Sequence, residues 1–270
     1  MKLRKTLPAE DLQSYVKYLW AIDIEQSDLP FSQLYFPYGS FELIFYLDNR
    51  GLMQYVNQKD VFYQPSFFYS GQFSKPFTLS FDFPCRCFGV SFRPFAGDIF
   101  NKIPASEFTD KMIELSELDP KNSIIQKLSS LHIDHEVFKE IEDYIKTIIL
   151  SNKIDIVSQF LAKAIILDPR RESTKKVISH IGLSKRRIEQ RFIQSTGLSI
   201  GMFTRKIRFQ KAVALLQNNP KSLTQIGLQV GYYDQSHFIS EFKTFSSLNP
   251  LSFIKQETTL KTFISSLVKN

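Results

Sequence analysis

The chain has 270 residues, of which 43% are hydrophobic and 23% are charged. These values fit one large or two average globular domains, and they exclude collagen-like, low-complexity and wholly disordered classes. Two cysteines exclude a disulfide framework and a four-thiolate zinc site. The first twenty residues lack the apolar stretch of a signal peptide, and no run of about 18 apolar residues occurs, so we expect a soluble cytoplasmic protein.

The net charge of +7 is distributed unevenly along the chain. Residues 1–152 hold 15 Lys and Arg against 20 Asp and Glu, whereas residues 153–255 hold 17 against 6. Concentrated basic charge is typical of proteins that bind a polyanion, because each neutralised phosphate releases a counterion. A solvated basic surface without such a partner is the alternative at this stage.

Residues 31–100 are rich in Phe and Tyr, which fall in short alternating runs. Examples are residues 41–47 and 61–63, and turn sequences such as 48–51 and 74–76 separate the runs. Short alternating runs at roughly ten-residue spacing predict a small antiparallel β-barrel. The expected fold class is therefore α+β, with this barrel first and helices after it.

An aromatic barrel interior either holds a small ligand or is filled by its own side chains. Glu42, Arg86 and Arg93 are the polar candidates for orienting a ligand. All four histidines lie outside residues 1–131, so we expect neither a metal nor a cofactor in the barrel. Cys85 and Cys87 are two apart on a strand, and the resulting Cα separation of about 6.5–7 Å favours two buried thiols over a redox pair.

Helical patterns follow after about residue 97. Apolar residues at spacings of three and four predict a helix from His135 to Leu150, whose apolar face packs onto the barrel or pairs with a second copy of the chain. Beyond a break at residues 151–152, the sequence predicts short helices over 154–167, 174–180, 185–194, 202–217, 223–230 and 235–245.

Two pairs of these helices share one layout. Gly182-Leu183-Ser184 joins the first pair, and Gly231 to Asp234 joins the second. Glycine lets the chain leave a helix through a left-handed conformation, and Ser or Asp caps the next helix. Both pairs are candidate helix-turn-helix units, in which the second helix, called the reading helix below, enters the major groove of DNA.

The segment from about Val177 to Phe253 resembles the DNA-binding domain of the AraC/XylS family of bacterial transcription regulators. Matching pieces occur in order at 182–184, 196–199, 230–232, 234–238 and 249–250, together with Arg208 and Ile226. The resemblance implies two reading helices in successive major grooves, joined by a long helix at about 202–217. Shorter pieces at 37–45, 71–72 and 88–94 resemble the cupin-like sensor domain that precedes it in many members.

The resemblance also implies roles for individual residues. Gln190 and Ser240 stand where the family usually has arginine, and Ser247 stands where glycine is usual. The implied DNA-binding residues are Lys185, Arg186, Arg187, Glu189, Gln190, Arg191, Gln235, Ser236, His237, Ser240 and Lys243.

We therefore expect a cupin-like sensor domain at 1–134, a linker or dimerisation helix at 135–152, an AraC-type DNA-binding domain at 153–255 and a tail at 256–270. The predicted function is sequence-specific transcription regulation, with double-stranded DNA as partner and RNA polymerase, a small effector or a second copy as further candidates. The alternatives are a cupin-type enzyme and a regulator controlled by a protein partner. No Ser/His/Asp, Cys/His or phosphate-loop motif favours the enzyme, so we expect no catalysis.

Overall fold

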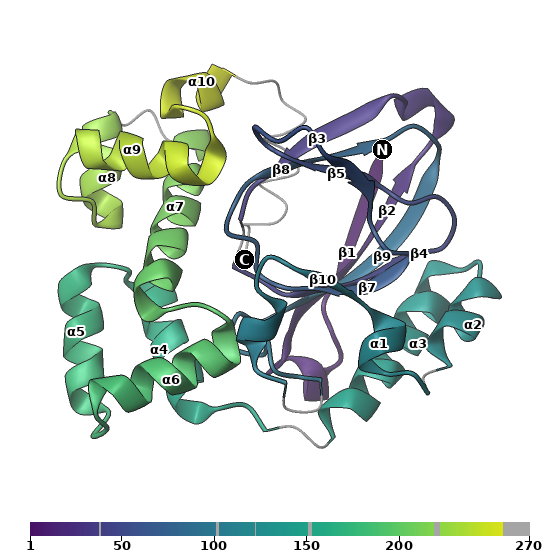
Figure 1. Cartoon of the computed structure of the whole chain (residues 1–270), viewed down its shortest axis with the longest axis horizontal. Helices are drawn as coiled ribbons and strands as arrows, with labels where there is room; N and C mark the ends of the chain where they lie inside the picture. The colour runs from purple at the N-terminus through teal and green to yellow at the C-terminus, as the bar shows by residue number, and fades with distance from the viewer. Residues whose placement is uncertain (38, 101–102, 122, 151–152, 219–221, 256–270) are drawn as a thin grey trace.

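Two antiparallel sheets curve around one interior in the N-terminal part of the chain (Figure 1). The computed structural model describes all residues except 38, 101–102, 122, 151–152, 219–221 and 256–270. The larger sheet has the order β1 (Lys2–Thr6), β2 (Val16–Ile24), β9 (Cys85–Phe92), β4 (Glu42–Tyr46), β7 (Phe67–Ser70) and β10 (Met112–Glu114). The smaller sheet has the order β3 (Phe31–Tyr35), β8 (Phe77–Phe81), β5 (Leu52–Tyr55) and β6 (Val61–Tyr63).

The alternating aromatic residues fill the space on both faces of the larger sheet. Phe41, Tyr69 and Phe88 belong to a core between this sheet and the helices outside it. Tyr46 and Phe68 belong to a second core between the two sheets. Because successive strand residues point to opposite faces, one alternating sequence supplies both cores. The predicted antiparallel β-domain is confirmed.

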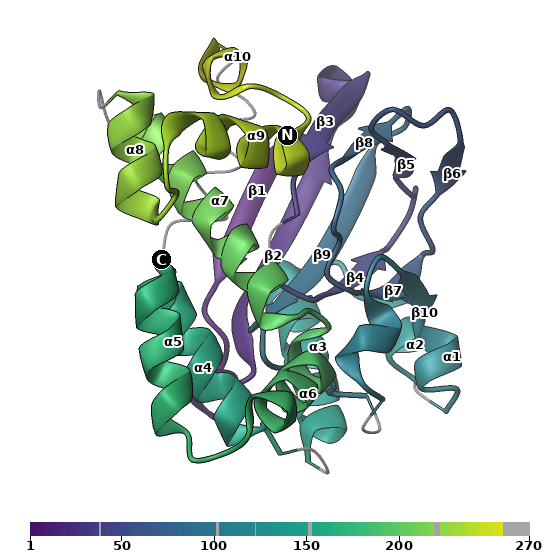
Figure 2. The same cartoon turned by 60° about the vertical axis from the view of Figure 1, so that its left-hand side comes forward.

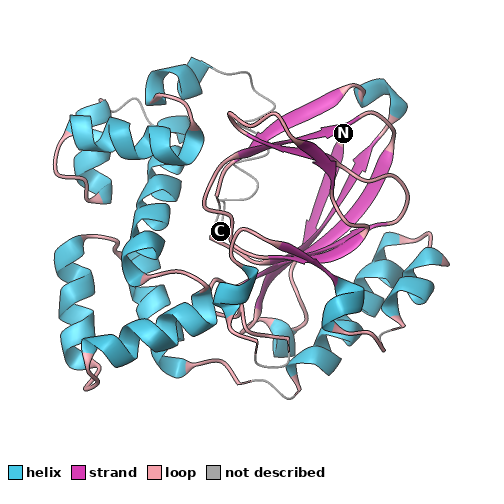
Figure 3. Ribbon diagram, viewed as in Figure 1, coloured by secondary structure: helices cyan, strands magenta, loops and turns pink. Residues whose placement is uncertain are grey.

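Three helices cover the outer face of the larger sheet: α1 (Leu115–Leu118), α2 (Ile124–Ser129) and α3 (Asp134–Ile149) (Figures 1 and 3). Helix α3 corresponds to the helix predicted over 135–150. Val137, Ile141 and Ile145 are fully buried in the outer core. The apolar face of α3 therefore packs onto the barrel, which is one of the two roles expected for it.

The remaining helices form a separate layer beside the barrel (Figure 2). Helix α7 (Ile200–Asn218) runs between two groups of shorter helices. The first group is α4 (Ile156–Leu167), α5 (Arg171–His180) and α6 (Lys185–Thr196), and the second is α8 (Leu223–Val230), α9 (Gln235–Ser246) and α10 (Pro250–Lys255). The predicted break at 151–152 and the tail at 256–270 lie outside the described residues.

Two apolar cores continue from the barrel into the helical layer. Phe36 packs edge-on against Phe209 of α7, with ring centroids 6.0 Å apart, and against Phe253 at 5.7 Å. Phe95 lies in one buried cluster with Phe192 of α6. None of the helices in the described part of the chain combines the length and hydrophobicity that crossing a membrane requires.

Candidate nucleic-acid interface

Helices α5 and α6 form one helix-turn-helix unit, and α8 and α9 form another. Gly182 and Gly231 begin the turns with φ angles of 71° and 97°. The Ser184 hydroxyl accepts the backbone N–H three residues later at 3.3 Å, and the Asp234 carboxylate does the same at 2.7 Å. These contacts satisfy amide groups that a helix start leaves without an intrahelical partner. The predicted turns and caps are confirmed.

The far ends of the reading helices are also built alike. Thr196 Oγ1 donates to the carbonyl four residues earlier at 2.7 Å and accepts the N–H two residues later at 3.2 Å. Ser246, fifty residues on, makes the same contacts at 2.6 and 3.1 Å. Gly197 and Ser247 then adopt left-handed conformations with φ of 72° and 58°. The two reading helices, with their caps, therefore repeat one another with a period of 50 residues.

Each reading helix is tied to the helix that precedes its unit by an ion pair. Arg191 Nε of α6 lies 2.7 Å from an oxygen of Asp155, the N-cap residue of α4. Arg205 of α7 makes two hydrogen bonds to Glu241 of α9, at 2.7 and 2.9 Å. The positions 155 and 205, and 191 and 241, are both fifty residues apart, so the same contact occurs twice with its charges exchanged.

Three of the predicted DNA-binding side chains have partners inside the domain. Arg191 pairs with Asp155, as described above. Glu189 accepts the backbone N–H of Ile200 at 3.0 Å and so caps α7, and Gln235 accepts a hydrogen bond from Thr224 of α8 at 2.6 Å. Burial alone raises the pKa of Asp155, but hydrogen bonds from Arg191 and Ser158 outweigh this effect and lower it.

The remaining predicted side chains are exposed on the two reading helices. His237 places its ring edge-on to Tyr232, with centroids 5.4 Å apart. In the described part of the chain, no side-chain hydrogen bond or ion pair holds the others, which are Lys185, Arg186, Arg187, Gln190, Ser236, Ser240 and Lys243.

The space between the two sheets contains a cavity of about 530 Å³. Helix α7 forms part of its wall through Ile207, Gln210, Lys211 and Ala214, which recur at the spacing of one helical face. Both domains therefore line the cavity. Among the described residues, no group of three or more His, Cys, Asp or Glu side chains is placed to hold a metal ion.

Polar and apolar groups occupy different ends of this cavity. The polar end is formed by neighbouring strands. Lys5 of β1 lies opposite Trp20 of β2, and Tyr18 of β2 and Glu42 of β4 both lie opposite Ser91 of β9. Glu42 accepts hydrogen bonds from Trp20, Ser40 and Ser91 at 2.7–2.9 Å. Removal from bulk water raises the pKa of Glu42 and lowers the pKa of Lys5 to about 8.

The other end of the cavity is apolar. Its wall is formed by Ile24, Tyr46, Leu79, Phe81, Cys85 and Cys87. Both cysteines are buried as free thiols, and burial raises the pKa of each. A raised thiol pKa suppresses the reactive thiolate, which agrees with two structural thiols.

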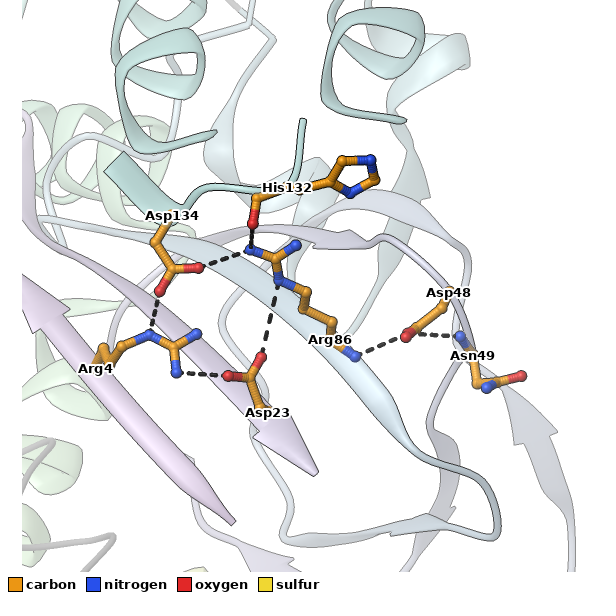
Figure 4. A network of polar contacts seen from close by, with 7 residues as sticks. All are labelled: Arg4, Asp23, Asp48, Asn49, Arg86, His132 and Asp134. Carbon is orange, nitrogen blue, oxygen red and sulfur yellow. Dashed lines mark hydrogen bonds and ion pairs between the residues drawn. The ribbon is translucent and has the colours of Figure 1, made fainter. Parts of the chain in front are cut away.

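The three predicted ligand-orienting residues are not together. Glu42 and Arg93 line the cavity, whereas Arg86 does not line it. Arg86 lies on the opposite face of β9 from its cysteine neighbours and donates to Asp134 at 2.8 Å and to the His132 carbonyl at 2.7 Å (Figure 4). It holds the start of α3 on the sheet. Strand alternation already separates Arg86 from Cys85 and Cys87, so the sequence contained this signal.

Two protein-family models match the chain. Residues 178–256 match a "Helix-turn-helix domain", and residues 4–114 match a "Domain of unknown function (DUF6597)". The helical segment is 31% identical over 81 residues to the HTH-type transcriptional regulator MtrA of Neisseria gonorrhoeae, which covers 30% of this chain and 27% of MtrA. Residues 178–256 are an AraC/XylS-type helix-turn-helix domain.

Other relatives match the same AraC/XylS-type domain. An uncharacterized HTH-type transcriptional regulator of Haemophilus influenzae is 39% identical over 64 residues, or 24% of this chain and 22% of the relative. The chain thus spans about a quarter of the length of these curated relatives. The solved structure of ToxT from Vibrio cholerae aligns over 94% of this chain and 98% of its own at 9% identity, with a TM-score of 0.49.

Proposed function

We propose that the chain is a sequence-specific DNA-binding transcription regulator whose α6 and α9 enter successive major grooves. The observation that carries this proposal is the repeat, at fifty residues, of the reading helices of two helix-turn-helix units, one unit before α7 and one after it. Nineteen helical residues span about 28 Å, close to the spacing of about 34 Å between major grooves on one face of DNA. The regulators among its relatives support the same function.

The exposed side chains of α6 suit base recognition. Arginine can bridge O6 and N7 of guanine, and glutamine can pair with N6 and N7 of adenine. Arg186 and Gln190 are one helical turn apart and unpaired within the described residues, so both are available for such contacts. On α9, Ser236 and Ser240 supply shorter polar groups, and Lys243 supplies charge.

Selection from randomised duplexes, followed by titration at several salt concentrations, tests this proposal. We expect a motif in two parts about one helical turn apart and a steep fall in affinity with salt. Binding without sequence enrichment would limit the function to non-specific affinity. An absence of DNA binding would overturn the proposal and favour the alternatives of an enzyme or a partner-binding protein.

Replacing Arg186 by alanine is expected to relax preference at one base position by about tenfold or more, because one bidentate contact contributes about 1–3 kcal/mol of discrimination. The measurement is a repeat of the duplex selection with the variant. The control is Lys175→Ala. Lys175 of α5 is exposed and forms an ion pair with Glu172, and its replacement should leave the selected DNA motif unchanged. An unchanged motif in Arg186→Ala would remove the role assigned to Arg186.

Replacing Lys243 by alanine is expected to weaken all duplexes alike. A phosphate contact carries no sequence information, and its loss reduces the slope of log affinity against log salt by about one unit. Titration of the selected duplex and of a scrambled duplex over a salt series measures both effects. A loss confined to the selected duplex would instead make Lys243 a base-reading residue.

We infer that the cavity of the N-terminal domain binds an amphiphilic effector with an acidic head. Basic side chains outnumber acidic ones among the described residues that line this cavity. The basic residues are Lys5, Lys17, Arg93 and Lys211, and the acidic residue is Glu42. Desolvation lowers the pKa of Lys17, Arg93 and Lys211, so a matching anion would stabilise their charged forms. The apolar end suits a hydrocarbon body.

Decanoic acid is expected to raise the melting temperature by several degrees when present at about 100 times its Kd, because such binding stabilises the native state by about 2.7 kcal/mol. Decanol has the same chain without the charge and is the control; it should raise the melting temperature less. Lys17→Gln should reduce the difference between the two compounds. Equal shifts for acid and alcohol would contradict the acidic head, and no shift for either would contradict the ligand site.

A further inference from the structure

Two fully buried polar side chains meet where the barrel contacts the helical domain. Gln72, the second residue after β7, and Lys206 of α7 are both 0% exposed. The Gln72 amide nitrogen donates to the Thr196 carbonyl at 2.9 Å, and its oxygen accepts a hydrogen bond from Lys206 Nζ at 3.3 Å. One amide of the barrel thus holds both the end of the first reading helix and the helix that joins the two units.

Two further hydrogen bonds from the barrel reach the C-terminal end of α6. The Gly97 N–H donates to the Ser195 carbonyl at 3.0 Å, and Thr109 Oγ1 donates to the Gly197 carbonyl at 2.9 Å. The last carbonyls of a helix have no intrahelical partner. Together with Gln72, the barrel therefore supplies the donors for three successive carbonyls at the end of the first reading helix.

Gln72 Oε1 is the side-chain acceptor of the Lys206 ammonium in the part of the chain that the structure describes. Desolvation lowers the pKa of Lys206 to about 7, while Asp110 opposes this shift. A buried ammonium that loses its acceptor is costly, whereas an apolar side chain of similar size at the same place is tolerated. A Cβ on Gly39, which lines the cavity, would lie 3.5 Å from Gln72 Oε1, so Gln72 adjoins the cavity wall.

We propose that Gln72 and Lys206 form a latch that holds the AraC/XylS-type domain against the barrel, and that its release lets the two domains separate. The latch belongs to the chain without DNA, so its test does not depend on the proposed DNA binding. Its place beside the cavity puts it within reach of changes that an occupant makes in β7 or α7.

The experiment measures the distance between two dyes, each attached to an introduced cysteine. One cysteine replaces Lys59 of the barrel, and the other replaces Tyr233 in the turn between α8 and α9. Both positions are exposed. Cys85 and Cys87 are buried with raised thiol pKa values, so the new cysteines react selectively. We expect Gln72→Leu to raise the ratio of separated to docked molecules at least tenfold, because it leaves Lys206 buried without its acceptor.

Adding Lys206→Met to Gln72→Leu should lower the ratio of separated to docked molecules again, to near that of the unmodified chain. The double variant has no buried ammonium that lacks an acceptor. Gln64→Leu is the matched control: Gln64 is a buried glutamine within the barrel, 3% exposed, and its loss should leave the distance unchanged. Should Gln72→Leu not fold, Gln72→Asn withdraws the amide by one methylene and should shift the ratio in the same direction. An unchanged distance in both Gln72 variants, or no rescue by Lys206→Met, would overturn the latch.

Discussion

Replacing Glu241 by arginine is expected to destabilise the second helix-turn-helix unit by about 2 kcal/mol and to weaken binding to the selected duplex. The side chain of Glu241 is 14% exposed, and that of Arg205 is 38% exposed. Exposed ion pairs contribute up to about 1 kcal/mol, and breaking a buried pair costs about 3–5 kcal/mol, so a half-buried pair falls between these values. The midpoint of the loss of helical circular dichroism on urea unfolding measures the effect.

The exchanged pair Arg205→Glu with Glu241→Arg is the decisive control. In the first unit, the equivalent positions already hold the acid on the earlier helix and the arginine on the reading helix, as Asp155 and Arg191. The swapped pair therefore has the same arrangement of charges as the first unit, with the acid on the earlier helix and the arginine on the reading helix. It should recover most of the stability lost in Glu241→Arg. If the swapped chain were as unstable as Glu241→Arg alone, packing around Glu241 and not its charge would explain the loss.

Sequence patterns predicted the helices best where a local residue marks their ends. The expected start of α6 at Lys185 and of α9 at Gln235 agree with the structure because Ser184 and Asp234 cap them. The start of α5 was expected at Thr174 but lies at Arg171. Its N-cap is Arg170, whose side chain makes no capping contact, so no local signal marked this boundary.

The side chains of the candidate site were harder to assign because their partners are far away in the sequence. Glu189 caps a helix that begins eleven residues later, and Arg191 pairs with a residue 36 positions earlier. The contact between Gln72 and Lys206 joins residues 134 positions apart. Exposure, charge and helical spacing indicate which face of a helix is polar, but tertiary packing decides which of its groups remain available to a ligand.

The docking of the two domains also depends on a glycine, and Gly197→Ser is expected to loosen it by about 2 kcal/mol. A Cβ at position 197 would lie 2.7 Å from Thr109 Oγ1 and 2.8 Å from the Ala105 carbonyl oxygen. Such contacts force the barrel loop to move, and overpacking of this kind costs about 1–3 kcal/mol. The distance between the dyes at positions 59 and 233 measures the loss of docking.

The fifty-residue repeat supplies the matched control for this prediction. Ser247 occupies the position equivalent to Gly197 with φ of 58°, so the fold already accepts serine in this left-handed conformation. Ser247 is exposed, unlike Gly197, and Ser247→Gly should therefore leave docking unchanged. If Gly197→Ser loosens docking and Ser247→Gly does not, the lost docking free energy comes from the contact of residue 197 with the barrel. Equal effects of the two variants would place the cost in the helix-turn-helix backbone and not in the contact of residue 197 with the barrel.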